Sequence, residues 1–165
     1  MKTLAKTTLI VTLGMMGCTD SLKTQNPNPE IQRLQPPGVV DASIWGFSQS
    51  VVVPAKGHYV FVSGQFSGTE DGRVIGDTHE EQIKQTYMNL KTVIEASGAQ
   101  PSDVVQVRLL IKDYEPKHVD MLLKESSALF GEHLPASTLI PVPRLATDEM
   151  LFEIEATLFV PANRE

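Results

Sequence analysis

Apolar and polar residues follow two different periods along residues 49–160, and these periods predict two kinds of structural element. Runs rich in β-branched and aromatic residues predict five strands. These strands cover residues 49–53, 58–62, 104–111, 137–142 and 151–160. The linker Pro54-Ala55-Lys56-Gly57 separates the first two runs, so we expect them to pair as a β-hairpin.

Two further segments carry apolar residues at helical spacing. Thr78 and Glu81 form the pattern of a capping box at the start of the first helix, and Gly98 marks its end. Its apolar positions are Ile83, Tyr87, Leu90 and Ile94. The second predicted helix starts near Pro116 and stops at Gly131. Its apolar face comprises Val119, Leu122, Leu123, Ser126, Leu129 and Phe130.

The order of these elements predicts an α+β domain with the sequence β-β-α-β-α-β-β, a single sheet and both helices on one face. The strand over 104–111 is apolar almost throughout, which predicts burial on both faces. Seven apolar strand residues are more than two helices can cover: Phe61, Leu109, Leu110, Leu139, Phe152, Ile154 and Leu158. We therefore expect an oligomer that covers the rest of the sheet.

The N-terminus has the features of a lipoprotein signal peptide over residues 1–17. Lys2 and Lys6 carry positive charge, and the apolar stretch over 9–17 is too short to span a bilayer in the mature protein. A small residue, Gly17, then precedes Cys18, the only cysteine in the chain. We expect Cys18 to carry lipid, with a buried free thiol as the alternative. Resemblance to Gram-negative lipoproteins places the protein in the cell envelope, facing the periplasm, with the outer membrane favoured.

Residues 18–41 predict a flexible tether between the lipidated cysteine and one domain over residues 42–165. This stretch is polar and contains Asn26-Pro27-Asn28-Pro29 and Pro36-Pro37-Gly38, without a sustained apolar period. The remaining residues, about 120, are enough for a single domain with its own core.

The charge and the motif content exclude several classes of function. A formal net charge of −6 disfavours binding to nucleic acid, because contacts with phosphates provide most non-specific affinity. The histidines His58, His79, His118 and His133 do not have the spacing of metal ligands. The chain contains neither a P-loop nor a dinucleotide fingerprint. We therefore predict no metal and no cofactor.

Several short motifs share their order and spacing with one known family. They include Phe47-Ser48-Gln49-Ser50-Val51, residues 60–65, Leu134-Pro135-Ala136-Ser137-Thr138 and Phe152-Glu153-Ile154-Glu155-Ala156. Together they resemble the reactive intermediate deaminase family (Rid, also called YjgF or endoribonuclease L-PSP-like) over residues 47–160. This resemblance implies a homotrimer with a central barrel and small-molecule clefts between subunits. It also implies hydrolysis of 2-imino acids, or their enamine tautomers, to 2-keto acids and ammonia.

The same resemblance assigns roles to particular residues. Glu153 matches the glutamate that positions the attacking water, and Phe47 matches a tyrosine of the cleft wall. Gly64 and Leu139 match positions whose backbone groups face the ligand. Ser137 matches the arginine that binds the substrate carboxylate. A charged bidentate pair is roughly twice as strong as a neutral hydrogen bond, so we expect weak or altered deaminase activity.

Two arginines could replace the missing charge. Arg144 resembles an arginine of some relatives, although a solvated surface residue is the more ordinary interpretation. Arg108 lies within an apolar strand, where a buried guanidinium would need a partner such as Glu153 or Glu155. It either lines the cleft or the trimer axis, or forms a structural ion pair.

Three functional hypotheses remain open at this point. The first is an imine or enamine deaminase, favoured by Glu153 and opposed by Ser137. The second is an enzyme or binding protein of the same fold whose ligand has no carboxylate at that position. The third is a non-catalytic module, tethered to the envelope, that binds a small molecule or acts through the trimer surface.

Overall fold

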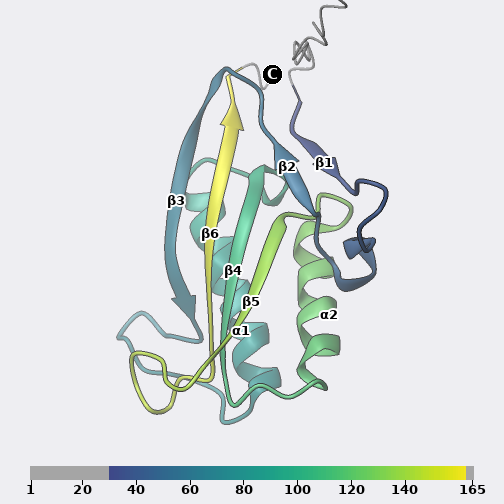
Figure 1. Ribbon diagram of the computed structural model, residues 1–165. Coiled ribbons are helices and arrows are strands. Elements are labelled where there is room, and N and C mark those ends of the chain that lie inside the picture. Colours follow the sequence, from purple (N-terminus) through teal and green to yellow (C-terminus); the bar gives the residue numbers. More distant parts are fainter. Residues whose placement is uncertain (1–29, 163–165) are drawn as a thin grey trace, which may run out of the picture.

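A computed structural model describes residues 30–162, which form a twisted sheet with two helices on one side (Figure 1). The main elements are β1 (Gln32–Leu34), β2 (Ser50–Val52), β3 (Gly57–Phe66), α1 (His79–Ala96), β4 (Val104–Lys112), α2 (His118–Phe130), β5 (Ala136–Val142) and β6 (Phe152–Pro161). Two short 3₁₀ helices join them, η1 (Ala42–Trp45) and η2 (Pro101–Asp103). The predicted α+β class is confirmed. Among the described helices, none is both long and apolar enough to cross a membrane.

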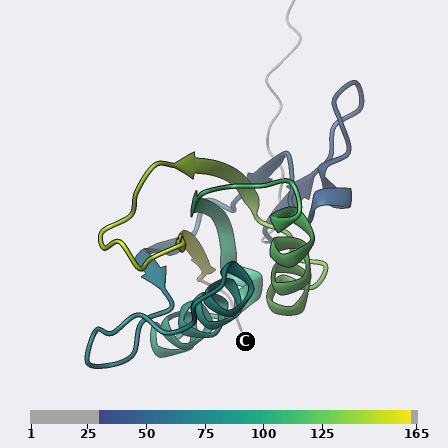
Figure 2. The same cartoon turned by 90° about the horizontal axis from the view of Figure 1, so that it is seen from below.

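The main sheet has the strand order β3-β6-β4-β5, with β4 and β5 parallel and the other neighbours antiparallel. Successive side chains of a strand point to opposite faces. Figure 2 shows both helices on one face of this sheet, where they cover the core. We call the other side the open face; it carries Phe61, Arg108, Leu110, Glu153 and Glu155.

The predicted capping box of α1 is confirmed. The Thr78 hydroxyl accepts a hydrogen bond from the backbone N–H of Glu81 at 3.3 Å. In return, the Glu81 carboxylate accepts from the backbone N–H of Thr78 at 3.1 Å, and hydrogen bonding to Thr78 lowers the pKa of Glu81. The predicted apolar positions are all buried against the sheet: Ile83, Tyr87, Leu90 and Ile94.

The predicted hairpin between residues 49–53 and 58–62 is wrong. β2 pairs with β1, whereas β3 pairs with β6 at the far edge of the main sheet. Ser48 forms a parallel bridge with Ala136, and its hydroxyl donates to the carbonyl oxygen of Leu134 at 2.7 Å. These contacts hold the start of β2 beside β5, which forms the opposite edge of the sheet.

The predicted flexible tether needs correction over its described part, residues 30–41. β1 lies within this part, and Arg33 extends from it to the main body of the domain. The guanidinium of Arg33 donates to the carbonyl oxygens of Ser102 at 2.7 Å and Val104 at 3.3 Å. Its partial burial lowers the pKa of Arg33. The predicted signal peptide and Cys18 lie outside the described residues.

The prediction that both faces of β4 are buried is also wrong for a single chain, because Arg108 is exposed on the open face. Of the seven apolar strand residues that we predicted the two helices could not all cover, five do face the helices: Leu109, Leu139, Phe152, Ile154 and Leu158. Only Phe61 and Leu110 lie on the open face. Phe61 is 78% exposed and its ring stacks on that of Tyr59, with the centroids 6.1 Å apart.

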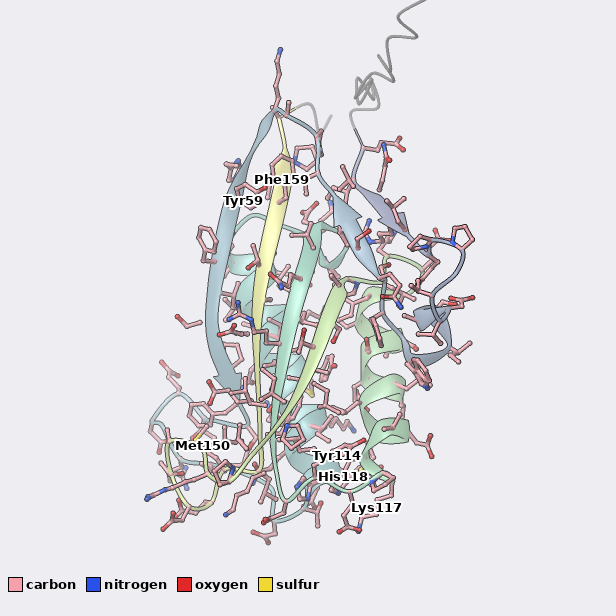
Figure 3. The ribbon with its side chains drawn as sticks, in the orientation of Figure 1. Tyr59, Tyr114, Lys117, His118, Met150 and Phe159 are labelled. Carbon is pink, nitrogen blue, oxygen red and sulfur yellow. The ribbon has the colours of Figure 1, made fainter. Side chains whose placement is uncertain are left out.

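Two histidines stack on each other where the two helices begin. His79 and His118 are the first residues of α1 and α2, and their ring centroids lie 4.1 Å apart. His118, near Tyr114 in Figure 3, is 1% exposed, and its Nδ1 accepts a hydrogen bond from the backbone N–H of Glu115 at 3.0 Å. Burial lowers the pKa of His118, repulsion from His79 and Lys117 adds to this effect, and attraction to Glu115 opposes it.

The buried His118 should make the protein less stable in mild acid. As pH falls below about 6.5, an unfolded chain protonates this histidine while the folded chain resists it, so the free energy of unfolding decreases. Protonation at Nδ1 would also place a proton against the N–H of Glu115. Urea denaturation at several pH values measures the effect, and His118→Asn should flatten the pH dependence. An unchanged dependence in this variant would contradict the assignment to His118, and His133→Asn serves as an exposed control.

Candidate functional site

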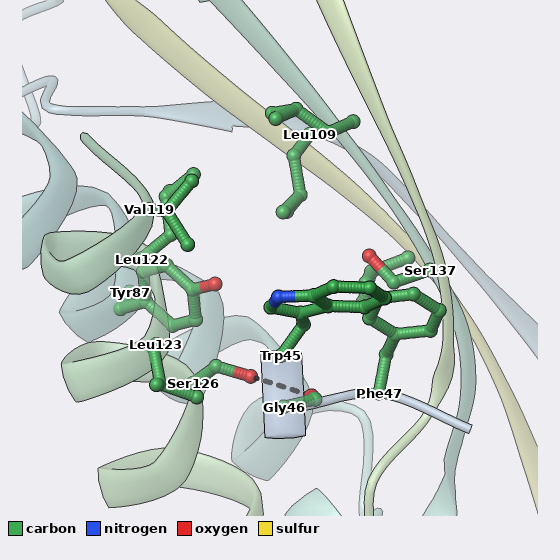
Figure 4. Close-up of a pocket in the computed structure, with 12 residues that line it drawn as sticks. Trp45, Gly46, Phe47, Tyr87, Leu109, Val119, Leu122, Leu123, Ser126 and Ser137 are labelled. Atoms are coloured by element: carbon green, nitrogen blue, oxygen red, sulfur yellow. Dashed lines mark hydrogen bonds between the residues drawn. The ribbon is translucent and has the colours of Figure 1, made fainter. Parts of the chain in front are cut away.

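A pocket of about 290 Å³ lies between α2, the strands β4 and β5, and the segment that contains η1 (Figure 4). Apolar side chains form most of its wall: Trp45, Phe47, Val107, Leu109, Val119, Leu122, Leu123 and Leu139. Gly46 and three hydroxyl-bearing residues complete it. This is the shape and lining typical of a site for a small molecule.

The segment 41–47 brings two aromatic rings to the pocket. Asp41 caps η1 by accepting a hydrogen bond from the backbone N–H of Ser43 at 3.0 Å. Gly46 then adopts a φ of +75°, a left-handed conformation that favours glycine, and its carbonyl oxygen accepts from the Ser126 hydroxyl at 3.4 Å. The rings of Trp45 and Phe47 are nearly parallel, at 18°, with centroids 6.4 Å apart. The turn therefore aligns both rings along one wall.

Helix α2 forms the opposite wall. Its predicted apolar face divides into two parts: Leu122 and Phe130 are buried, whereas Val119 and Leu123 are only half-buried. Val119, Leu122 and Leu123 line the pocket. A methyl group added at Gly46 would approach Leu123 to 2.8 Å, so the helix and the turn are in close contact. A stripe that resembles core from its spacing is thus partly the wall of a cavity.

Besides the indole N–H of Trp45, three hydroxyl groups from three elements are the polar side-chain groups of this pocket. They belong to Tyr87 on α1, Ser126 on α2 and Ser137 on β5. Burial raises the pKa of Tyr87, so its phenol stays protonated at neutral pH. None of the described residues that line the pocket is charged. Within residues 30–162, moreover, His, Cys, Asp and Glu side chains form no cluster suited to a metal ion.

The structure divides the predicted site residues between the two faces of the sheet. Phe47, Ser137 and Leu139 line the pocket on the helix side, where Ser137 lies opposite Val107 in the β4–β5 register. Glu153 lies opposite Leu110 and points to the open face. One chain therefore does not bring Ser137 and Glu153 to the same ligand.

Gly64 lies beside Glu153 rather than in the pocket. A side chain at position 64 would collide with the Glu153 carboxylate, so only glycine leaves room for it there. Burial raises the pKa of Glu153, and the neighbouring charge of Glu155 raises it further. A carboxyl group with a raised pKa is suited to proton transfer, which makes Glu153 a second chemical feature, separate from the pocket.

Neither alternative arginine lines the pocket. Arg108 pairs with Glu155 on the open face, one of the two partners that its sequence position indicated. Arg144 lies in the loop after β5 and pairs with Asp148 at 3.1 Å, with both side chains well exposed. The charge missing at Ser137 is therefore not replaced by either residue within this chain.

Sequence reasoning missed most of the pocket residues, among them Trp45, Tyr87 and Ser126. Trp45 is the only tryptophan of the chain and comes just before the motif that starts at Phe47, a signal that could have identified it. Tyr87 and Ser126 have helical positions indistinguishable from core positions. Their role in the pocket becomes visible only when α1, α2 and the sheet are placed together.

Comparison with known proteins agrees with the fold. The sequence profile of the family Endoribonuclease L-PSP matches residues 40–160. A RutC family protein of Pyrococcus abyssi is 33% identical over 114 residues, covering 68% of this chain and 85% of the relative. The 2-iminobutanoate/2-iminopropanoate deaminase of Salmonella typhimurium is 30% identical over 103 residues, covering 61% of this chain and 78% of that enzyme.

A solved structure with the same arrangement is that of YyfB from Yersinia pestis, described as a protein of unknown function of the conserved Rid family. It superimposes with a TM-score of 0.74 at 29% sequence identity, covering 79% of this chain and 98% of that one. The similarity thus extends over nearly all of the described domain.

Proposed function

Since the chain belongs to the endoribonuclease L-PSP family, which includes the Rid proteins, we propose that it binds an uncharged small molecule and has weak or no 2-imino acid deaminase activity. The observation that carries this proposal is Ser137 in a pocket whose described lining has no charged residue. If the chain has no deaminase activity at all, the same proposal describes a non-catalytic binding or interaction module tethered to the envelope.

The energetic argument concerns the carboxylate of an imino acid. Such a group loses water on entering the pocket and needs a counter-charge to compensate. The Ser137 hydroxyl offers one neutral hydrogen bond, whereas a guanidinium offers a charged bidentate pair. The difference is about 2 kcal/mol, which corresponds to roughly thirtyfold in affinity. A ligand without that carboxylate avoids this loss.

Keto-acid formation from freshly generated 2-iminopropanoate tests the proposed function. The Salmonella typhimurium deaminase provides the positive control, and the uncatalysed rate provides the baseline. We expect the wild-type chain to stay close to the baseline. Activity comparable to that of the Salmonella enzyme would overturn the proposal and indicate that another cation binds the substrate carboxylate.

We also propose a homotrimer, in which the open faces meet. Two observations support it: Phe61 is 78% exposed beside Tyr59, and the site residues lie on opposite faces of one sheet. Two copies, unlike one, can present Ser137 from one subunit and Glu153 from another to the same ligand. The proposed cleft then lies between subunits and includes the mouth of the pocket.

The trimer should be visible by light scattering on residues 30–165. We expect a mass of three chains at micromolar concentration, and partial or complete dissociation when Phe61→Asp places a charge on the open face. Lys84→Ala, an exposed change on the outside of α1, should leave the trimer intact. A wild-type monomer at this concentration would contradict the proposed assembly.

The proposed location is the cell envelope, with Cys18 lipidated. Cys18→Ser should yield an unprocessed precursor, or a protein no longer attached to the outer membrane, because the thiol that accepts the lipid is gone. Membrane fractionation and gel mobility measure both effects. A serine variant that fractionates and migrates like the wild type would rule out the signal-peptide interpretation.

A further inference from the structure

The pocket presents flat aromatic surfaces on one side and aliphatic side chains on the other. In Figure 4 the indole of Trp45 extends into the pocket above Phe47, and Leu109 and Val119 lie across from it. Aromatic rings pack favourably at centroid distances of about 4.5–7 Å, in offset or edge-to-face arrangements. A ligand that carries a planar ring gains this packing, whereas a small keto acid has no ring to offer.

The size of the pocket limits the ligand further. An apolar cavity of about 150 Å³ is sufficient to hold benzene. The present pocket, at about 290 Å³, has room for one ring with a short substituent. A long acyl chain or a fused polycyclic compound would extend beyond it.

The polar groups indicate the character of the substituent. The hydroxyls of Tyr87 and Ser137 can each donate or accept a hydrogen bond, whereas the Ser126 hydroxyl, which donates to the Gly46 carbonyl oxygen, can accept one from a ligand. Figure 4 shows the Tyr87 oxygen directed to the pocket interior. Because the described lining contains neither a cation nor a carboxylate, this chain offers neither a carboxylate nor an ammonium group a counter-charge to offset the water that it would lose. An alcohol, amide or ketone group satisfies the hydroxyls without this cost.

Building on the proposed function, we infer that the ligand is an uncharged compound with a single planar ring and a short hydrogen-bonding substituent. The ring packs against Trp45 and Phe47, and the substituent binds the hydroxyls of Tyr87, Ser126 and Ser137. Trp45, which is 47% exposed, forms the part of the wall that faces solvent.

The fluorescence of Trp45 provides a direct test, because it is the only tryptophan and lines the pocket. The full chain is titrated with benzyl alcohol, benzoate and cyclohexylmethanol. These probes separate the effects of charge and of ring planarity. We expect a saturable emission change with benzyl alcohol. Benzoate should bind with an affinity lower than that of benzyl alcohol by about tenfold or more. Cyclohexylmethanol should also bind more weakly, because its ring has no π face.

Two variants locate the binding. Val119→Phe fills the pocket and should abolish the response to benzyl alcohol, whereas the matched change Lys124→Phe on the exposed side of α2 should retain it. Ser137→Arg adds a positive charge to the pocket wall and should reverse the order, so that benzoate binds more tightly than benzyl alcohol. This second variant keeps the test valid if Val119→Phe does not fold.

Each adverse outcome has a distinct meaning. If wild type shows no saturable response, or if Val119→Phe folds and responds unchanged, the inference that the ligand carries a ring is wrong. The proposed function is unaffected by this outcome as long as the rate in the imine assay stays at the uncatalysed baseline. If wild type prefers cyclohexylmethanol, the inference that the ring is planar is wrong. If wild type prefers benzoate, both the inference and the proposal of an uncharged ligand fail.

Discussion

Ser137→Arg should raise the rate of 2-iminopropanoate hydrolysis about thirtyfold or more above that of the wild type, measured as keto-acid formation. Arginine returns a bidentate partner for the carboxylate at a position that already lines the pocket. Ser137→Lys is the matched control; it restores the charge without the planar fork and should give a smaller gain. Phe47→Tyr, added to Ser137→Arg, should give a further small increase by returning a hydroxyl to the wall.

The role of Glu153 can be separated from that of position 137. Adding Glu153→Ala to Ser137→Arg should remove the gain, since the carboxyl group that positions water is lost. Because these residues lie on opposite faces of one sheet, mixing two kinds of chain within the proposed trimer gives a sharper result. Mixing the double variant with wild-type chains should restore part of the activity, since Glu153 then comes from a neighbour. If Ser137→Arg gives no gain in a well-folded trimer, the cleft differs beyond this residue and the non-catalytic module is favoured.

Gln82→Ala should lower the free energy of unfolding by about 3 kcal/mol, because it removes three hydrogen bonds between a buried side chain and the backbone of two loops. Gln82 is 1% exposed, and its amide nitrogen donates to the carbonyl oxygens of Gly76 at 2.9 Å and Glu149 at 2.8 Å. Its amide oxygen accepts from the backbone N–H of Leu151 at 2.8 Å. One side chain thus joins the loop after β3 to the loop before β6.

Urea denaturation of Gln82→Ala and Lys84→Ala provides the comparison. Lys84 is exposed on the same helix, and its replacement should change stability by no more than about 0.5 kcal/mol. Equal stabilities of the two variants would show that the three hydrogen bonds of Gln82 contribute little. A selective loss in Gln82→Ala would confirm that this residue holds both loops, and with them the start of the strand that carries Glu153.

Local features of the fold were predictable from sequence because their causes are local. The capping box at Thr78 and Glu81 involves residues three apart, and the buried stripe of α1 follows from helical spacing alone. The hairpin prediction failed because the pairing of β2 depends on distant contacts, such as that of Ser48 with Leu134. Arg33 likewise reaches residues far along the chain, so a stretch that resembled a tether is part of the domain.

The site was predictable only in part. Motif matching indicated Phe47, Ser137 and Leu139, which the structure brings to one pocket. Helical spacing could not show that Leu123 lines a cavity rather than the core. The placement of Glu153 on the other face depends on the register of β6 against β4, and this register involves residues about fifty positions apart.

The preference of the pocket for uncharged ligands is the central claim, and calorimetric binding of 2-oxobutanoate and its primary amide tests it most directly. The two compounds differ chiefly in the charge at the position that a guanidinium would bind. We predict that the wild-type protein binds the amide about tenfold or more tightly than the keto acid, and that Ser137→Arg reverses this order. Tighter binding of 2-oxobutanoate by the wild type would contradict the claim.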